Sequence, residues 1–332
     1  ETSDVYKGQM GVKDREYNEL SEKIYEMAIQ CGFENCGIIP LSEVDGYKQR
    51  LNERREKIPQ SVQFYKKMEK FTCLEKRYPW GKSIVVCTSW LGKYQYPKSL
   101  QGKYAKAFML SGDTVPDSEE HKNKKRFEAW MRDQKIYFEG GETNAPLRDV
   151  PLRHAAVAAG LGIFRKNNFF YTEKGSYYAL EGYIIDKTCV HKHVNNIKSC
   201  SDTCLLCQQA CKTQALSSPY TMNPLACVSF WTTFGKGRIP KSLDEGQFED
   251  WVCGCDSCQD ACPYNRRDWS VGEKFPGLEE LTELLRPQNI VKASDAVLCE
   301  KVIPKTERHI PPDQVETLRI TAVRVLRQSR KT

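Results

Sequence analysis

The chain has 332 residues, a net charge of +7 and 40% hydrophobic residues, and no apolar run approaches the roughly 18 residues that a membrane helix needs. These values exclude an integral membrane protein and predict a soluble globular protein with a substantial core. Fifteen cysteines with clustered CxxC spacings indicate metal ligands in a reducing, cytoplasmic setting, because a chain of this size does not need disulfides to fold. The polar stretch Glu1 to Lys13 has no apolar segment typical of a targeting signal.

Helices and strands alternate through the first 190 residues, as in α/β folds. Apolar residues recur at helical spacing from Leu20 to Cys31, and Gly32 is the expected end of that helix. The elements expected next are a strand at 36–39, one or two polar helices over 50–70, a strand at 83–90, a helix over 118–134, a helix over 152–159 that starts at Pro151, and a strand at 180–186.

Nine of the fifteen cysteines lie between Cys200 and Cys262, in two motifs typical of iron–sulfur ligation. The first motif is Cys200-x3-Cys204-x2-Cys207-x3-Cys211, and the second is Cys255-x2-Cys258-x3-Cys262-Pro263, with Cys227 between them as the remote ligand. In bacterial ferredoxins the fourth cysteine of such a run ligates the other cluster. The sequence therefore predicts two [4Fe–4S] clusters: cluster one on Cys200, Cys204, Cys207 and Cys262, and cluster two on Cys227, Cys255, Cys258 and Cys211.

Two alternatives accompany this assignment. Zinc also uses CxxC pairs, but a zinc ribbon needs only four thiolates and gives no reason for the further cysteine after each run. Cys253 is a rival of Cys227 for the remote position. The other cysteines are expected to be small buried hydrophobic residues; they are Cys31, Cys36, Cys73, Cys87, Cys189 and Cys299.

Two short helices are expected after the cysteines, at 278–285 and at about 315–326, where Val315, Leu318, Ala322 and Val325 share a face. The last 32 residues carry eight Lys or Arg against three acidic residues. Such a segment either contacts phosphates or is a solvated helix face. The sequence therefore predicts that the chain is divided into three parts, at residues 1–190, 191–268 and 269–332.

The cysteine segment resembles epoxyqueuosine reductase in residue order, from Cys200 through Cys227-Val-Ser-Phe-Trp-Thr to Gly254-Cys-Asp-Ser-Cys-Gln-Asp-Ala-Cys-Pro-Tyr-Asn265. The resemblance extends to Ala159-Gly-Leu-Gly-Ile-Phe-Arg-Lys-Asn167, which is close to the family's AGLGxxGKN passage. Residues of the first ninety match as well, so the resemblance covers roughly residues 15 to 268.

The resemblance implies a fold of two parts: an α/β (α+β) corrinoid-binding domain of the reduced nitroreductase-like type, then a ferredoxin-like domain with two clusters. A short helical, basic C-terminus would follow. Cobalamin would lie between the two domains and receive electrons through the clusters. Lys166, Asn167 and Ser229 stand where the family lines the corrinoid.

The chain departs from the family at the proton donor, which is an Asp a fixed distance before AGLG. Counting back without gaps reaches Pro146, and Asp149 is the nearest candidate. Only seventy residues follow Cys262, whereas the family usually continues into helical repeats that grip tRNA.

The first functional hypothesis is therefore a cobalamin-dependent iron–sulfur reductase that acts on epoxyqueuosine in tRNA or on another substrate. Its expected partners are tRNA and an electron donor such as a ferredoxin or flavodoxin. The second hypothesis is an electron-transfer or reductive-activation protein without a corrinoid.

Overall fold

The computed structural model describes residues 12–112, 115–140, 150–306 and 309–330. Its main sheet has four strands in the order β1-β2-β6-β3, and every neighbouring pair is antiparallel. The strands are β1 (Asn35–Pro40), β2 (Ser83–Trp90), β3 (Phe138–Gly140) and β6 (Tyr178–Ile185). A second sheet pairs β4 (Ile163–Phe164) with β5 (Phe170–Tyr171).

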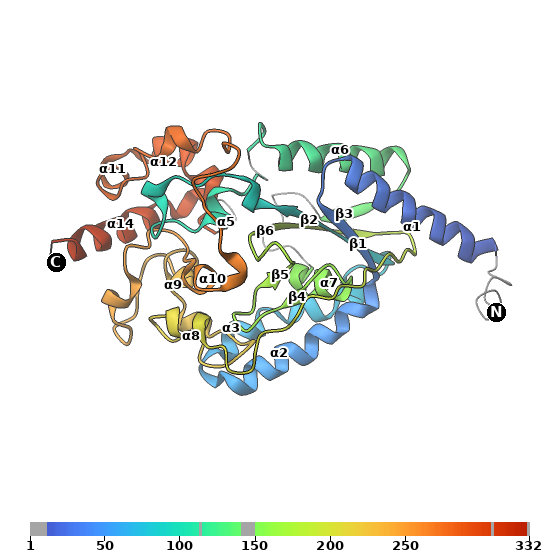
Figure 1. The fold of residues 1–332 in the computed structure, drawn as a ribbon, viewed down its shortest axis with the longest axis horizontal. Coiled ribbons are helices and arrows are strands. Elements are labelled where there is room, and N and C mark those ends of the chain that lie inside the picture. Colours follow the sequence, from blue (N-terminus) through green and yellow to red (C-terminus); the bar gives the residue numbers. More distant parts are fainter. Residues whose placement is uncertain (1–11, 113–114, 141–149, 307–308, 331–332) are drawn as a thin grey trace.

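Helices cover both faces of the main sheet, which explains why β2 is buried over nearly its whole length. Side chains alternate between the faces of a strand, so Val85 and Cys87 pack with α1 (Val12–Gln30) and α6 (Glu119–Asp133). Ile84 and Val86 pack on the other face. That face is covered by α2 (Gly46–Lys57), α3 (Val62–Lys66), α4 (Leu74–Arg77) and α7 (Leu152–Ala158). Figure 1 shows α1 and α6 above the sheet and α2 and α7 below it.

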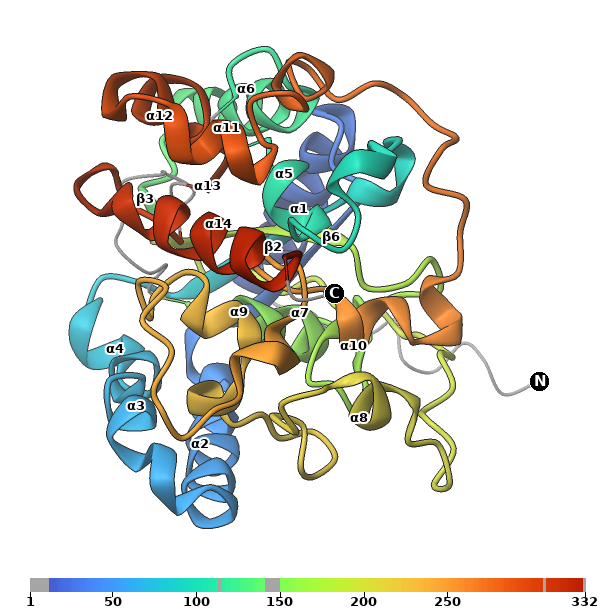
Figure 2. The same cartoon turned by 90° about the vertical axis from the view of Figure 1, so that its left-hand side faces the viewer.

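The C-terminal helices share a third core with residues 91–110. Leu318, Ala322 and Val325 of α14 are buried there together with Val252 and Cys253. The helices of this region are α5 (Lys106–Met109), α11 (Pro287–Lys292), α12 (Asp295–Lys301), α13 (Ile303–Thr306) and α14 (Glu316–Gln328). The cysteine segment lies beside them, with three short helices: α8 (Leu206–Ala210), α9 (Val228–Trp231) and α10 (Ser257–Asp260) (Figure 2).

Most sequence expectations for the front of the chain are confirmed, including the strand at 83–90 and the helix that starts after Pro151. The mixed helix and strand class is also confirmed, and the antiparallel strand pairs place it on the α+β side. The helix expected at 278–285 is wrong, because only a 3-10 turn forms at Glu279–Leu281. Pro287 begins the next helix, and the residue before a proline is disfavoured in helical conformation, so Arg286 is extended. The three-part division stays a prediction.

No helix in the described ranges is long and apolar enough to cross a membrane. Four of the six outlying cysteines are buried as predicted, namely Cys31, Cys36, Cys87 and Cys189. The prediction is wrong for Cys73, which is exposed, while Cys299 is partly exposed.

The turn after α7 holds the segment that leads to the first cysteine motif. Gly160 has a φ of +76°, and a Cβ added to it would lie 1.8 Å from the carbonyl oxygen of His193. The backbone N–H of His193 donates to the carbonyl of Ala159 at 2.9 Å. The close approach of the two backbones therefore requires glycine at position 160.

We expect Gly160→Ala to lower the stability by more than about 2 kcal/mol, because both the φ angle and the backbone of His193 oppose a side chain. Gly102→Ala is the matched control, since Gly102 has a φ of +72° but no atom within 4 Å of the added Cβ. Its cost should be about 1 kcal/mol. Thermal unfolding midpoints measure both changes, and equal shifts would contradict the contact with His193.

Candidate functional site

Four of the eight predicted ligands gather where α8 meets α10. Burial, together with the neighbouring thiolates of Cys200, Cys204 and Cys262, raises the pKa of the Cys207 thiol to about 11. Charges perturb a pKa in this way only at short range. The structure thus brings together the four cysteines that the sequence groups as cluster one, here called the first thiol set.

The other four predicted ligands form a second thiol set beside the first. Burial raises the pKa of Cys258 well above its usual range, and the thiolates of Cys255, Cys227 and Cys211 raise it further. Burial also raises the pKa of Cys227, whereas hydrogen bonds from the backbone N–H groups of Phe230 and Ser229 lower it. Those N–H groups lie at the start of α9 and point at the sulfur, as hydrogen bonds to a cluster ligand do.

The two thiol sets share their helices. Cys207 of the first set lies in α8, and Cys211 of the second set directly follows that helix. Cys258 of the second set lies in α10, and Cys262 of the first set follows two residues after it. Each short helix therefore serves both sets, which is the exchange typical of two-cluster ferredoxins. The ligand assignment itself stays a prediction.

Within the described residues, no group of three or more His, Cys, Asp or Glu side chains converges closely enough to hold one metal ion. A zinc ion would require such a group, with all ligands within about 2.3 Å of the metal. A cubane takes one thiolate at each of its four irons and therefore spreads its thiols more widely. Each set offers four thiols, and the backbone N–H groups at Cys227 are donors of the kind that cluster ligands accept.

Cys253 stands apart from both sets. It is fully buried in the core shared with the C-terminal helices, and burial alone raises the pKa of its thiol to about 12. No neighbouring thiolate contributes to that shift. The thiolate of Cys211 does contribute to the raised pKa of Cys227, so Cys227 lies near the second thiol set and fits the remote position better.

Lys166 and Asn167, which the sequence predicts at the corrinoid, both contact the cysteine loops. The Lys166 ammonium group donates to the carbonyls of Ser201 and Asp202, each at 2.8 Å, and of Cys204 at 3.1 Å. An ammonium group has three N–H donors, so all are in use. The Asn167 amide donates to the carbonyl of Cys258 at 3.1 Å and to the Tyr171 hydroxyl at 2.8 Å.

Neighbouring residues of the β4–β5 loop thus hold one loop of each thiol set. The sequence did not indicate this bracing role, and the corrinoid role of both residues stays a prediction. Ser229 is partly exposed at the start of α9, beside Cys227. Asp149, the predicted proton donor, lies outside the described residues.

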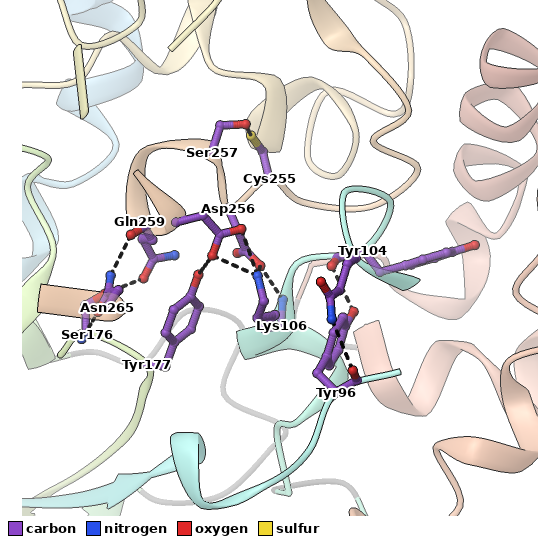
Figure 3. Close-up of polar contacts among 12 residues, drawn as sticks. Tyr96, Tyr104, Lys106, Ser176, Tyr177, Cys255, Asp256, Ser257, Gln259 and Asn265 are labelled. Atoms are coloured by element: carbon purple, nitrogen blue, oxygen red, sulfur yellow. Dashed lines mark hydrogen bonds and ion pairs between the residues drawn. The ribbon is translucent and has the colours of Figure 1, made fainter. Parts of the chain in front are cut away.

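A buried ion cluster anchors α10 to the core beneath it (Figure 3). The ammonium group of Lys106 lies 3.3 Å from Asp256 and 2.8 Å from Asp260, and its backbone N–H donates to Asp256 at 2.8 Å. Tyr177 donates to Asp260 at 2.6 Å. Lys106 and Asp256 are both at most 2% exposed, so the pair lies in a medium where an unpaired charge is very costly.

Asn265 joins the end of the second motif to the loop between β5 and β6. Its carbonyl oxygen accepts from the backbone N–H of Ser176 at 2.8 Å, and its amide donates to the carbonyl of Gln259 at 2.8 Å. The Ser176 hydroxyl donates to the Gln259 side chain at 2.8 Å (Figure 3). The main sheet and the cysteine segment are therefore joined by buried hydrogen bonds as well as by the ion cluster.

Guanidinium groups gather on the outer side of the β4–β5 loop. Arg54 donates to the Asn168 side chain at 3.0 Å, Arg153 donates to the Asn168 carbonyl at 2.8 Å, and Arg50 lies 4.2 Å from the centre of the Phe164 ring. Three guanidinium groups therefore contact β4 or the loop that follows it.

The basic C-terminal segment makes mainly structural contacts. Arg324 is 2% exposed and donates to the carbonyls of Glu249 and Trp251. Arg319 forms ion pairs with Asp295 and Glu316. Of the two interpretations of this segment, the helix face is favoured for these residues, although Arg324 is buried and not solvated.

Residues 199–265 match a family model described as a 4Fe-4S double cluster binding domain. The epoxyqueuosine reductase of Cellulophaga algicola is 29% identical over 256 residues, which is 74% of this chain and 79% of that protein. The enzyme of the same name from Pseudomonas aeruginosa is 34% identical over 119 residues, 35% of this chain and 32% of that protein.

Solved structures of epoxyqueuosine reductases have the same fold. The Bacillus subtilis enzyme superposes with a TM-score of 0.71 at 23% identity and covers 93% of this chain and 81% of that one. A structure with an epoxyqueuosine-modified stem loop of tyrosine tRNA gives 0.70 at 22% identity, with the same coverage. The resemblance seen in the cysteine motifs is confirmed: the chain is a homologue of epoxyqueuosine reductases with a double-cluster domain, and this relationship indicates an oxidoreductase.

We expect Lys106→Met to destabilise the protein by about 3–5 kcal/mol, because it leaves the buried Asp256 carboxylate without its cation. The matched control is Lys192→Met, which removes a surface ion pair with Glu43 (2.6 Å) whose partners are 41% and 34% exposed. That change should cost less than about 1 kcal/mol. Thermal unfolding measures both, and a Lys106 variant as stable as the control would refute the anchoring role.

Proposed function

We propose that this chain is an epoxyqueuosine reductase, an oxidoreductase that passes electrons through two [4Fe–4S] clusters to reduce epoxyqueuosine to queuosine in tRNA. The observation that carries the proposal is the pair of adjoining thiol sets inside a fold shared with epoxyqueuosine reductases over most of the chain. Loss of the epoxide oxygen as water, with an alkene formed, consumes two electrons and two protons. Two one-electron clusters can hold both electrons at once.

The electrons are proposed to enter at the first thiol set. Leu205, Leu206 and Tyr264 flank its cysteines and are 47%, 43% and 47% exposed. An exposed apolar surface beside a redox centre suits the small, transient interface of an electron carrier. A ferredoxin or flavodoxin is the proposed donor, in a reducing compartment such as the cytoplasm.

Cobalamin is the proposed electron acceptor between the clusters and the substrate. When bound, it supplies a strongly nucleophilic cobalt centre, which is chemistry that no side chain offers. Ser229, next to the second thiol set, is the proposed lining residue, while Lys166 and Asn167 are proposed to act by holding the cysteine loops. Asp149 remains the proposed proton donor.

The tRNA substrate is proposed from the relative that was solved with a modified stem loop and from the net charge of +7. Phosphate contacts make such binding sensitive to salt. An electron-transfer protein without a corrinoid is the second candidate. It is favoured by the one observation that the polar groups of Lys166 and Asn167 are already engaged by the cysteine loops.

Anaerobic reconstitution should load about eight irons per chain, as two cubanes of four. Cys227→Ser should lose about half of this iron, because position 227 is the remote ligand of cluster two. Cys253→Ser is the matched control, since Cys253 is buried away from both thiol sets, and it should keep all eight. Iron and sulfide assays measure the content. If Cys253→Ser lost half of the iron and Cys227→Ser kept all of it, Cys253 would be the remote ligand.

The reconstituted protein should retain cobalamin on a sizing column and convert an epoxyqueuosine stem loop to queuosine only with cobalamin present. Asp149→Asn should retain iron and cobalamin but lose turnover, because the proton donor is gone. Mass spectrometry of the digested RNA measures conversion, and an unmodified stem loop is the control for binding at two salt concentrations. Eight irons without cobalamin binding would favour the second candidate. Full turnover by the Asn variant would remove Asp149 from the mechanism.

A further inference from the structure

Arg165 is a buried arginine that contacts Cys200 and, two residues after Cys262, Tyr264. It is 1% exposed, and its Nη1 donates to the sulfur of Cys200 at 3.8 Å. Its guanidinium stacks on the ring of Tyr264 at 3.5 Å from the ring centre, two residues after Cys262. Cys200 and Cys262 belong to different motifs. The Arg165 side chain therefore lies where the two motifs come together to complete the first thiol set.

The guanidinium also lies 5.2 Å from the centre of the Tyr171 ring, but two of its nitrogens lack a hydrogen bond among the described residues. Both Nε and Nη2 are buried and make no hydrogen bond. A charged donor left unpaired inside a protein costs several kcal/mol. A cubane on the first set would bring sulfide and thiolate acceptors next to Arg165 and thus supply the missing partners.

The passage Ala159 to Asn167 has Arg165 where the family's AGLGxxGKN has glycine. The first motif also has one residue more between Cys200 and Cys204 than the ferredoxin spacing. Both departures meet at Cys200, because Lys166 holds the carbonyls of the lengthened loop while Arg165 donates to the Cys200 sulfur.

The second thiol set has a different electrostatic environment. The carboxylate of Asp256, directly after Cys255, is 1% exposed and raises the pKa of that thiol further, after the larger effect of burial. The cation of Lys106 is divided between Asp256 and Asp260 and does not leave net positive charge there. The first set therefore has a buried cation that stacks on tyrosine rings and forms no ion pair with a carboxylate of the described residues, whereas the second set has a buried anion with its counterion.

We propose that Arg165 tunes cluster one, holding its reduction potential above that of cluster two by donating hydrogen bonds to the Cys200 thiolate and to the cluster sulfides. Reduction adds one electron to a centre that four thiolates already make anionic, so an adjacent positive charge in a low dielectric stabilises the reduced form. Electrons from the donor would then rest on cluster one. Their transfer to cluster two would be uphill in potential and would proceed only while the acceptor beyond keeps cluster two oxidised. The inference rests on the two-cluster assignment of the proposed function.

The test is a redox titration of the reconstituted protein followed by electron paramagnetic resonance, which resolves two midpoints. Arg165→Gln should lower the midpoint of cluster one so that its reduced-to-oxidised ratio falls at least tenfold at fixed potential, or 59 mV for one electron. Cys200→Ser identifies which signal belongs to cluster one. The midpoint of cluster two should move much less.

Two variants serve as controls. Arg50→Gln removes an equal charge from a guanidinium that stacks on Phe164, the residue before Arg165, and it should leave both midpoints nearly unchanged. Arg165→Lys keeps the charge but loses the forked donors, so its shift should be smaller than that of Arg165→Gln.

The outcomes separate this inference from the proposed function. Unchanged midpoints in Arg165→Gln, or equal shifts of both clusters, would overturn the tuning role while eight irons per chain leave the two clusters intact. Loss of four irons in both Arg165 variants would also overturn it, because the arginine would then be needed for assembly. A wild-type protein without two cubanes would instead refute the proposed function.

Discussion

The packing of α8 against α10 is the contact on which the rest of the site depends. Each helix is less than two turns long, yet each supplies a thiol to one set and is followed within two residues by a thiol of the other. Helices this short are not stable alone, so their positions must come from tertiary contacts. The ion cluster of Lys106 holds α10 from below, and the β4–β5 loop holds the cysteine loops from the side. Loss of the contact between α8 and α10 would therefore displace thiols of both sets.

The same constraint relates the two ends of the chain to the redox site. Residues 91–110 and the C-terminal helices form one core, and Lys106 extends from that core to Asp256 between two cysteines. On the opposite side, Asn167 extends from the sheet domain to the carbonyl of Cys258. The cluster segment is thus held between two cores rather than attached as a separate module, which suits a protein that must keep redox centres at fixed separations.

The cysteine spacing predicted most of the grouping that the structure brings together, because the ferredoxin pattern specifies which cysteine crosses over. It left Cys227 and Cys253 as rivals for the remote position, and the assignment of ligands to clusters stays a prediction. The strand at 83–90 and the helix after Pro151 could also be predicted, since β-branched runs and proline at a helix start act locally. The roles of Lys106 and Arg165 could not be predicted from the sequence. Nothing near Lys106 marks it as buried, and its partners lie 150 residues away. Arg165 could have been noticed only as the residue that replaces a glycine of the family passage.

The central claim is that eight thiols hold two cubanes with exchanged ligands. Anomalous scattering at the iron edge, from crystals grown without oxygen, tests it most directly. The account predicts two compact groups of four irons, one bound by Cys200, Cys204, Cys207 and Cys262 and the other by Cys211, Cys227, Cys255 and Cys258. A single metal atom between CxxC pairs, or Cys262 bound to the same group as Cys255 and Cys258, would contradict it.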